Sequence, residues 1–198
     1  MPTLVEATEA FVTQLLTEDL DPRFLYHNLA HTRRVVQRTK ELMEHYGLGA
    51  KEQNSLLLAA WLHDTGYTRG REGHEQESSR IAMQFLQDQG LDQQAIEGVC
   101  RLILATERYH DPENLLEEII RDADASHLGQ DIFMEVSQLL KQELAQMDIA
   151  QYSPEEWRQL NLEIFQKEHH FYTDYAVKHW QPGKERNLQS LLKEPPDS

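Results

Sequence analysis

The chain has 198 residues, of which 39% are apolar and 27% are charged, and its 19 Lys and Arg against 34 Asp and Glu leave a formal net charge of −15. This composition is typical of one globular domain with a buried core. A mean hydropathy of −0.66 and the lack of any long apolar run exclude a membrane-spanning helix. The N-terminal residues lack the basic and apolar regions of a signal peptide, so we expect a cytoplasmic protein.

The charge also limits the partners. A strongly acidic surface disfavours duplex nucleic acid and acidic membranes, which leaves small molecules as candidate ligands. It does not forbid a homodimer through an apolar helical face. The single cysteine, Cys100, excludes an internal disulfide and a thiolate zinc site, and its apolar neighbours indicate a buried side chain.

Apolar residues recur at intervals of three and four along most of the chain, and no segment alternates as a half-buried strand does. The pattern predicts an all-α fold, a single bundle of about eight to ten helices. In chain order the expected helices cover residues 4–18, 28–46, 51–64, 75–89, 92–106, 113–128 and 132–147, a helix opened by residues 153–156, and a short helix at 186–192.

Local signals refine several of these helices. Residues 56–62 are apolar on every side, which places their helix in the centre of the core. Asp111 as N-cap with Pro112 at the first position predicts the start of the sixth helix. Ser153 to Glu156 is a capping box with proline. Gln181-Pro182-Gly183 is expected to interrupt the helices, and residues 194–198 are expected to form a flexible tail.

Imidazoles and carboxylates stand where apolar helices begin or end. His63-Asp64 closes the most apolar helix, and burying this pair costs several kcal/mol unless it is paired or bound to a cation. His27 and His31 are four residues apart and share a face if both are helical. Asp122 and Asp124 close another apolar helix. Such a mixed nitrogen and oxygen set suits manganese, iron, cobalt, nickel or magnesium.

At this point the chain resembles a known family. His31, His63-Asp64 and Asp124 are similar to the H…HD…D signature of the HD-domain metal-dependent phosphohydrolases. The flanking segments are also similar to those of the family: Tyr26-His27-Asn28-Leu29-Ala30-His31-Thr32, Leu58-Ala59-Ala60-Trp61-Leu62-His63-Asp64-Thr65-Gly66-Tyr67 and His74-Glu75-Gln76-Glu77-Ser78. The similarity covers residues 24–130, and parts of residues 165–188 resemble a bacterial subgroup of predicted HD phosphohydrolases.

The resemblance implies one HD-type helical domain over residues 1–193, in which residues 131–193 form a helical extension. It also implies a divalent transition metal, Mn, Fe, Ni or Co with Mg as a further candidate, held by His31, His63, Asp64 and Asp124. Asp122 and Asp124 cannot both point at one site, and the apolar stripe does not choose between them. The family pattern favours Asp124, which leaves Asp122 beside a ligand or paired with Arg121. His127 is expected to be a core histidine.

The catalytic residues are expected to be His27 and Asp64. The string Tyr-His-Asn-x-x-His is similar to that of the class I cyclic-nucleotide phosphodiesterases, in which the first histidine is a general acid. Asp64 is expected to orient the attacking water as well as to bind metal. The alternative reading of His27 is that it only caps the helix that begins at Asn28.

Four further residues are candidates for binding substrate. Arg69 and Arg71 lie in a glycine-flanked loop after the HD pair, where guanidinium groups could clamp a phosphate or remain solvated. Lys184 is a similar candidate. His74 could contact the phosphate or start a helix. His74 and His110 could also bind a second metal, but His74 follows Asp64 by only ten residues, less than in two-metal relatives.

The leading hypothesis is therefore a metal-dependent phosphohydrolase that cleaves a phosphomonoester or phosphodiester of a nucleotide. The alternatives are a cyclic or signalling-nucleotide phosphodiesterase, a di-iron HD oxygenase and a non-catalytic nucleotide-binding module. Because ligating histidines must be neutral, metal binding is expected to weaken below about pH 6.

Overall fold

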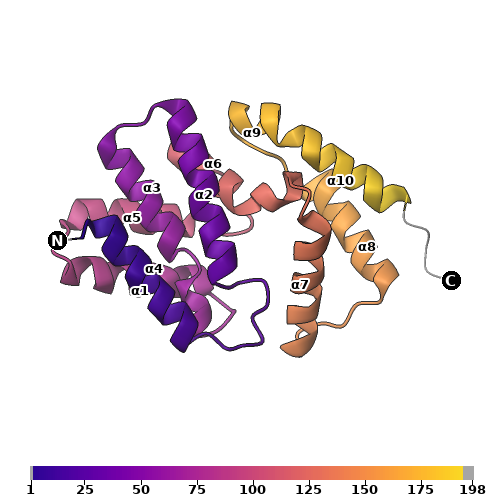
Figure 1. Cartoon of the computed structure of the whole chain (residues 1–198), viewed down its shortest axis with the longest axis horizontal. Helices are drawn as coiled ribbons and strands as arrows, with labels where there is room; N and C mark the ends of the chain where they lie inside the picture. Colours follow the sequence, from indigo (N-terminus) through magenta and orange to yellow (C-terminus); the bar gives the residue numbers. More distant parts are fainter. Residues whose placement is uncertain (1, 194–198) are drawn as a thin grey trace. The chain divides into compact units, whose positions relative to one another are not determined.

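The computed structural model describes residues 2–193, which form an all-α structure without strands (Figure 1). The α-helices of this part of the chain are α1 (Leu4–Glu18), α2 (Leu29–Tyr46), α3 (Ala50–Leu62), α4 (His74–Asp88), α5 (Gln93–Leu104), α6 (Leu115–Asp124), α7 (Phe133–Gln146), α8 (Pro154–Glu163), α9 (Asp174–His179) and α10 (Gln181–Lys193). Short turns, η1 (Thr65–Thr68), η2 (Ala125–Gly129) and η3 (Ile164–Glu168), join some of them. The predicted fold class is confirmed. The tail predicted at 194–198 lies outside the described residues.

The chain forms two compact units. The first contains the chain up to Asp21 together with His27–Asp124, and the second contains Pro22–Tyr26 and the chain from Ala125 onward. Among the described helices none combines the length and the apolar character that a membrane crossing needs.

Helix α3 is the centre of the first unit. It packs against α1, α2, α4, α5 and α6. Its residues Leu56, Leu58, Ala59, Ala60, Trp61 and Leu62 are all at most 4% exposed, as expected for a helix without a polar face. The centre of the core therefore ends at the HD pair. Cys100 of α5 is also buried, as predicted.

The close packing of α4 depends on Gly66 in η1. Its backbone N–H donates to Ser78 Oγ at 2.8 Å. A Cβ at this position would overlap the carbonyl oxygen of His74 and lie 2.8 Å from Ser78 N. Only glycine leaves room for the first turn of α4 to lie directly on the turn after the HD pair.

The second unit has its own apolar cluster, formed by Leu128, Phe133, Leu162, Phe165 and Leu191. The predicted capping box opens α8, where Ser153 accepts a hydrogen bond from Glu156 N and Pro154 is the first helical residue. Glu143 of α7 is 1% exposed and its carboxylate accepts a 2.7 Å hydrogen bond from the backbone N–H of Tyr26. The segment Pro22–Tyr26 is thereby fixed to this unit.

Two predicted boundaries are wrong. Helix α6 begins at Leu115 rather than after Asp111-Pro112, because the side chain of Asn114 accepts hydrogen bonds from the N–H groups of Leu116 and Glu117 and caps the helix there. Gln181-Pro182-Gly183 does not interrupt the helices but forms the first turn of α10. Proline is tolerated there because the first turn needs no N–H donor.

Candidate metal centre

Four side chains of the first unit converge on one point. His31 Nε2 lies 3.2 Å from Asp64 Oδ2 and 3.0 Å from Asp124 Oδ1. His63 Nε2 lies 3.3 Å from Asp64 Oδ2, 3.6 Å from Asp124 Oδ1 and 3.3 Å from His31 Nε2. The two histidines and Asp64 are almost fully buried, and the side chain of Asp124 is 30% exposed. Asp124 is thus the most exposed of the four residues.

Helix ends place these side chains. His31 lies in the first turn of α2, which Asn28 caps by accepting hydrogen bonds from Ala30 N and His31 N. His63 directly follows the last residue of α3, and Asp124 is the last residue of α6. The C-terminal ends of helices carry partial negative charge, which favours a bound cation.

The orientation of His63 is fixed by its other ring nitrogen. Nδ1 lies 3.0 Å from the carbonyl oxygen of Ala60, to which it can only donate, so the proton is on Nδ1. The lone pair of Nε2 then faces the centre. This is the arrangement of metal-binding histidines, in which a hydrogen bond to the distal nitrogen selects the tautomer.

The residues fit a divalent cation. With neutral imidazoles the group carries two negative charges, one of them on the buried Asp64, whose Oδ2 is without a well-aligned hydrogen bond among the described residues. Neighbouring ligands around a cation with bonds of about 2.1 Å are about 3 Å apart, close to the distances found here. Ligand atoms of His31, His63 and Asp124 also form a group that could hold a metal ion.

The electrostatics of the centre point the same way. Burial would lower the pKa of His31 and of His63, but contacts with Asp64 and Asp124 outweigh it and raise the pKa of both imidazoles. Burial would raise the pKa of both carboxyl groups, but the two histidines hold each pKa well below its usual value. The centre therefore attracts positive charge, whether protons or a metal.

Two more imidazoles flank the ligand group. The ring of His27 lies 6.1 Å from that of His31, and His74 Nε2 lies 3.8 Å from Asp64 Oδ1. His74 Nδ1 is 3.0 Å from the carbonyl oxygen of Arg71, so its proton is held there and Nε2 faces Asp64. The cap of α2 is Asn28, so the predicted capping role of His27 is taken by its neighbour.

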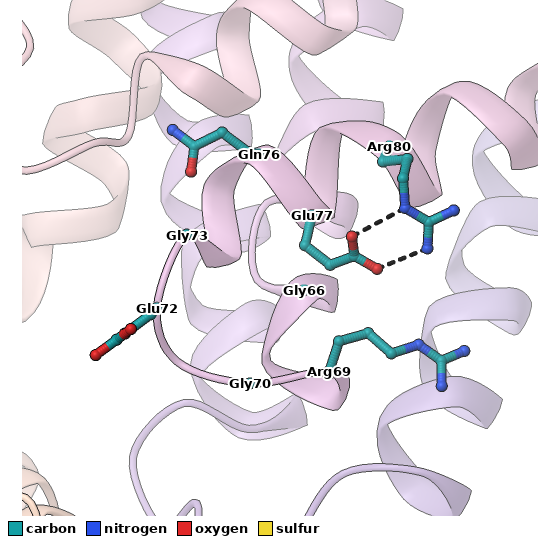
Figure 2. A pocket seen from close by; sticks show the side chains of 8 residues that line it. All are labelled: Gly66, Arg69, Gly70, Glu72, Gly73, Gln76, Glu77 and Arg80. Atoms are coloured by element: carbon teal, nitrogen blue, oxygen red, sulfur yellow. Dashed lines mark hydrogen bonds and ion pairs between the residues drawn. The ribbon is translucent and has the colours of Figure 1, made fainter.

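Arg69 and Arg71 have different surroundings. Arg69 lines an open pocket of about 470 Å³ together with Arg80 and Glu77 (Figure 2). There Arg80 forms two hydrogen bonds to Glu77, and the guanidinium group of Arg69 extends toward the same side. Arg71 is exposed and is not among the lining residues. Of the two predicted phosphate-binding arginines, Arg69 thus lines this pocket and Arg71 does not.

The remaining candidates have partners of their own. Lys184 belongs to the second unit, is 4% exposed, and donates a 2.5 Å hydrogen bond to the carbonyl oxygen of His169. Burial lowers its pKa to about 8.

His110 Nε2 lies 2.9 Å from Glu117 Oε2. Asp122 is buried but lies outside the group of ligand atoms, and His127 Nδ1 is 3.5 Å from the hydroxyl of Tyr26.

One neighbour of the centre was not predicted to have a role. Tyr67 is 4% exposed and stacks on both His27 and His74. Its only signal in the sequence is its position three residues after Asp64, within His63-Asp64-Thr65-Gly66-Tyr67.

Comparison with known proteins agrees with the geometry. The family model of the HD domain matches residues 28–129, which contain all four converging residues. The chain belongs to the HD-domain family. The fold is similar to the crystal structure of the Lin1889 protein from Listeria innocua, with a TM-score of 0.61 and 17% identity over 96% of this chain and 97% of that chain. No curated protein matches the sequence.

Proposed function

We propose that the protein is a metal-dependent phosphohydrolase that cleaves a phosphomonoester or a phosphodiester bond of a nucleotide. The observation that carries the proposal is the convergence of His31, His63, Asp64 and Asp124 at distances of 3.0–3.6 Å. Membership of the HD-domain family, a superfamily of metal-dependent hydrolases, supports the same class of reaction.

His31, His63, Asp64 and Asp124 would hold one divalent cation, with Mn, Fe, Ni, Co and Mg as candidates. When bound, such an ion would lower the pKa of a coordinated water and polarise a phosphoryl oxygen. Asp64 has a second oxygen, Oδ1, 3.8 Å from His74 Nε2, which would orient a water by accepting its hydrogen bond. Asp124 is the most exposed of the four, which supports an approach of the substrate from its side.

His27 would protonate the leaving oxygen. A general acid must lie within reach of the ester but need not bind the metal. The position of the His27 ring, 6.1 Å from the ring of His31, supports this role. His74, with its proton held by Arg71 O, would accept a hydrogen bond from water or from a protonated phosphate through Nε2. Arg69 would attract the anionic substrate from the neighbouring pocket. Substrate roles for Arg71 and Lys184 stay predictions.

The proposed nucleotide substrate is supported by the segment from Tyr26 to His31, which is similar to that of the class I cyclic-nucleotide phosphodiesterases. The same similarity keeps a cyclic or signalling nucleotide as the second candidate substrate.

The test compares the wild type with Asp124→Asn and Asp122→Asn. Both variants neutralise a carboxylate of α6, but only Asp124 belongs to the ligand group. Metal content is measured on the purified proteins. Hydrolysis of bis-p-nitrophenyl phosphate and p-nitrophenyl phosphate is followed with added manganese, nickel, cobalt or magnesium.

We expect about one equivalent of metal in the wild type and in Asp122→Asn, and loss of both metal and hydrolysis in Asp124→Asn. Preference between the two esters separates a diesterase from a monoesterase. Two equivalents of iron without hydrolysis would favour the oxygenase. A wild type that neither binds metal nor hydrolyses either ester would leave a binding module.

A further inference from the structure

Tyr67 joins the two imidazoles that flank the candidate metal centre. Its ring stacks on His27, with centroids 4.2 Å apart and an interplanar angle of 20°, and on His74, with centroids 4.1 Å apart and an angle of 30°. The rings of His27 and His74 themselves are 6.4 Å apart. One buried aromatic ring therefore contacts both non-ligand histidines of the site.

The three rings come from three separate segments of the chain. His27 precedes α2, Tyr67 lies in η1, and His74 is the first residue of α4. The backbone N–H of Tyr67 donates to the carbonyl oxygen of Asp64 at 3.1 Å, which fixes the backbone of Tyr67 relative to the HD pair. The close approach of η1 and α4 at Gly66 fixes the other side of the stack.

We propose that Tyr67 is a positioning residue, whose ring holds the imidazoles of His27 and His74 in the orientation in which they serve the phosphate ester. The inference deepens the proposed function and rests on it. Tyr67 stacks on His27 and His74, and neither of these belongs to the converging ligand group. Loss of its ring should therefore leave metal binding intact and impair the transfer of a proton to the leaving oxygen.

The experiment compares Tyr67→Leu, Tyr67→Phe and Phe85→Leu with the wild type. Phe85 is a matched control because it also forms a close aromatic stack, with Phe11 at 4.3 Å and 14°. It lies in the same unit, eleven residues after His74 on α4, which is roughly 16 Å along the helix axis. Phe85→Leu therefore reports the cost of losing a stack away from the site.

Hydrolysis is measured with phenyl phosphate esters whose leaving groups differ in basicity. A good leaving group such as p-nitrophenolate needs little protonation, whereas a basic one depends on the general acid, a contribution that is typically on the order of 100-fold or more. We expect Tyr67→Leu to lose on the order of tenfold in kcat, more for basic leaving groups, with little change in KM. Tyr67→Phe should restore most of this loss, because it keeps the ring.

Two further readouts separate positioning from general damage. Metal content and metal affinity should match the wild type in all three variants. The imidazole Cε1–H resonances of His27 and His74 should shift in Tyr67→Leu and stay near their wild-type positions in Phe85→Leu. In the double variant Tyr67→Leu with His27→Asn, the further loss caused by Tyr67→Leu should be smaller than its loss in the wild type, because one of the two imidazoles that Tyr67 positions is already absent.

Several results would overturn the proposal. They are an equal loss for all leaving groups, a loss of metal from Tyr67→Leu, a loss in Tyr67→Phe as large as in Tyr67→Leu, and additive effects in the double variant. A wild type without metal-dependent hydrolysis would refute the proposed function and this role with it. Hydrolysis by the wild type that Tyr67→Leu does not reduce would refute the role of Tyr67 alone.

Discussion

Replacing Gly66 by alanine tests how the site is built. The new Cβ would overlap the carbonyl oxygen of His74 and lie 2.8 Å from Ser78 N and 2.9 Å from His74 C. Ordinary contacts of a Cβ begin near 3.4 Å, so Ser78 N alone would have to move by about 0.6 Å and the carbonyl oxygen of His74, which lies closer, by more. Overpacking of this kind costs about 1–3 kcal/mol of unfolding free energy.

The shift also moves His74, the first residue of α4, away from Asp64. We therefore expect Gly66→Ala to lower kcat on the order of ten- to hundredfold while the metal content stays unchanged. Urea unfolding in the presence of a chelator measures the stability without the contribution of metal binding.

Gly98→Ala is the matched control. Gly98 lies within α5, and the nearest heavy atom to a Cβ there is Arg101 Nη2 at 3.9 Å. Alanine is the better helix former, so this variant should be stabilised by about 0.5–1 kcal/mol and keep its activity. A Gly66→Ala protein as stable as Gly98→Ala would refute the close packing of η1 and α4.

Three further predictions follow from the charges. Added metal should raise the Tm of the wild type and not that of Asp124→Asn, as followed by thermal unfolding. Because Asp64 and Asp124 raise the pKa of His31 and His63, metal affinity measured by calorimetry should already fall as the pH approaches about 6.5 from above. For the same reason the unfolding free energy of the metal-free protein should decrease as the pH rises through these raised pKa values. A metal-free protein that gains stability between pH 6.5 and about 8 would contradict this. The pKa of Lys184, lowered to about 8, predicts that the wild type gains stability relative to Lys184→Met between pH 8 and about 10.4, since only the unfolded chain binds the proton there. Parallel urea midpoints for these two proteins over this pH range would count against a buried ammonium group.

Much of the fold was predictable because its signals are local. Helix α1 has the predicted bounds of residues 4–18, and α8 begins at its capping box. The apolar run in α3 predicted the central helix, since a helix without a polar face must be covered on all sides. In contrast, α9 has only six residues, too few for a periodic pattern, and the start of α6 was assigned to Asp111 rather than to the cap at Asn114.

The candidate site, too, was predictable only in part from the sequence. The position of His31, His63 and Asp64 at the ends of apolar helices identified them as candidates, but this pattern did not distinguish Asp122 from Asp124. That choice came from the resemblance to the HD-domain family, and the structure brings Asp124 to the other three residues. The contact of Tyr67 with His27 and His74 depends on how η1 and α4 pack in space, and periodicity along the chain carries no information about it.

The path of the chain between the two units limits how this protein can be cut or rebuilt. The peptide bonds Tyr26–His27 and Asp124–Ala125 both join one unit to the other, and each includes a candidate site residue. A fragment that stops at Asp124 keeps all four converging residues but loses Glu143, which holds the backbone of Tyr26 next to His27. A minimal catalytic fragment or a transplant of this centre onto another scaffold must therefore include α7, although no residue of α7 lies among the converging ligands.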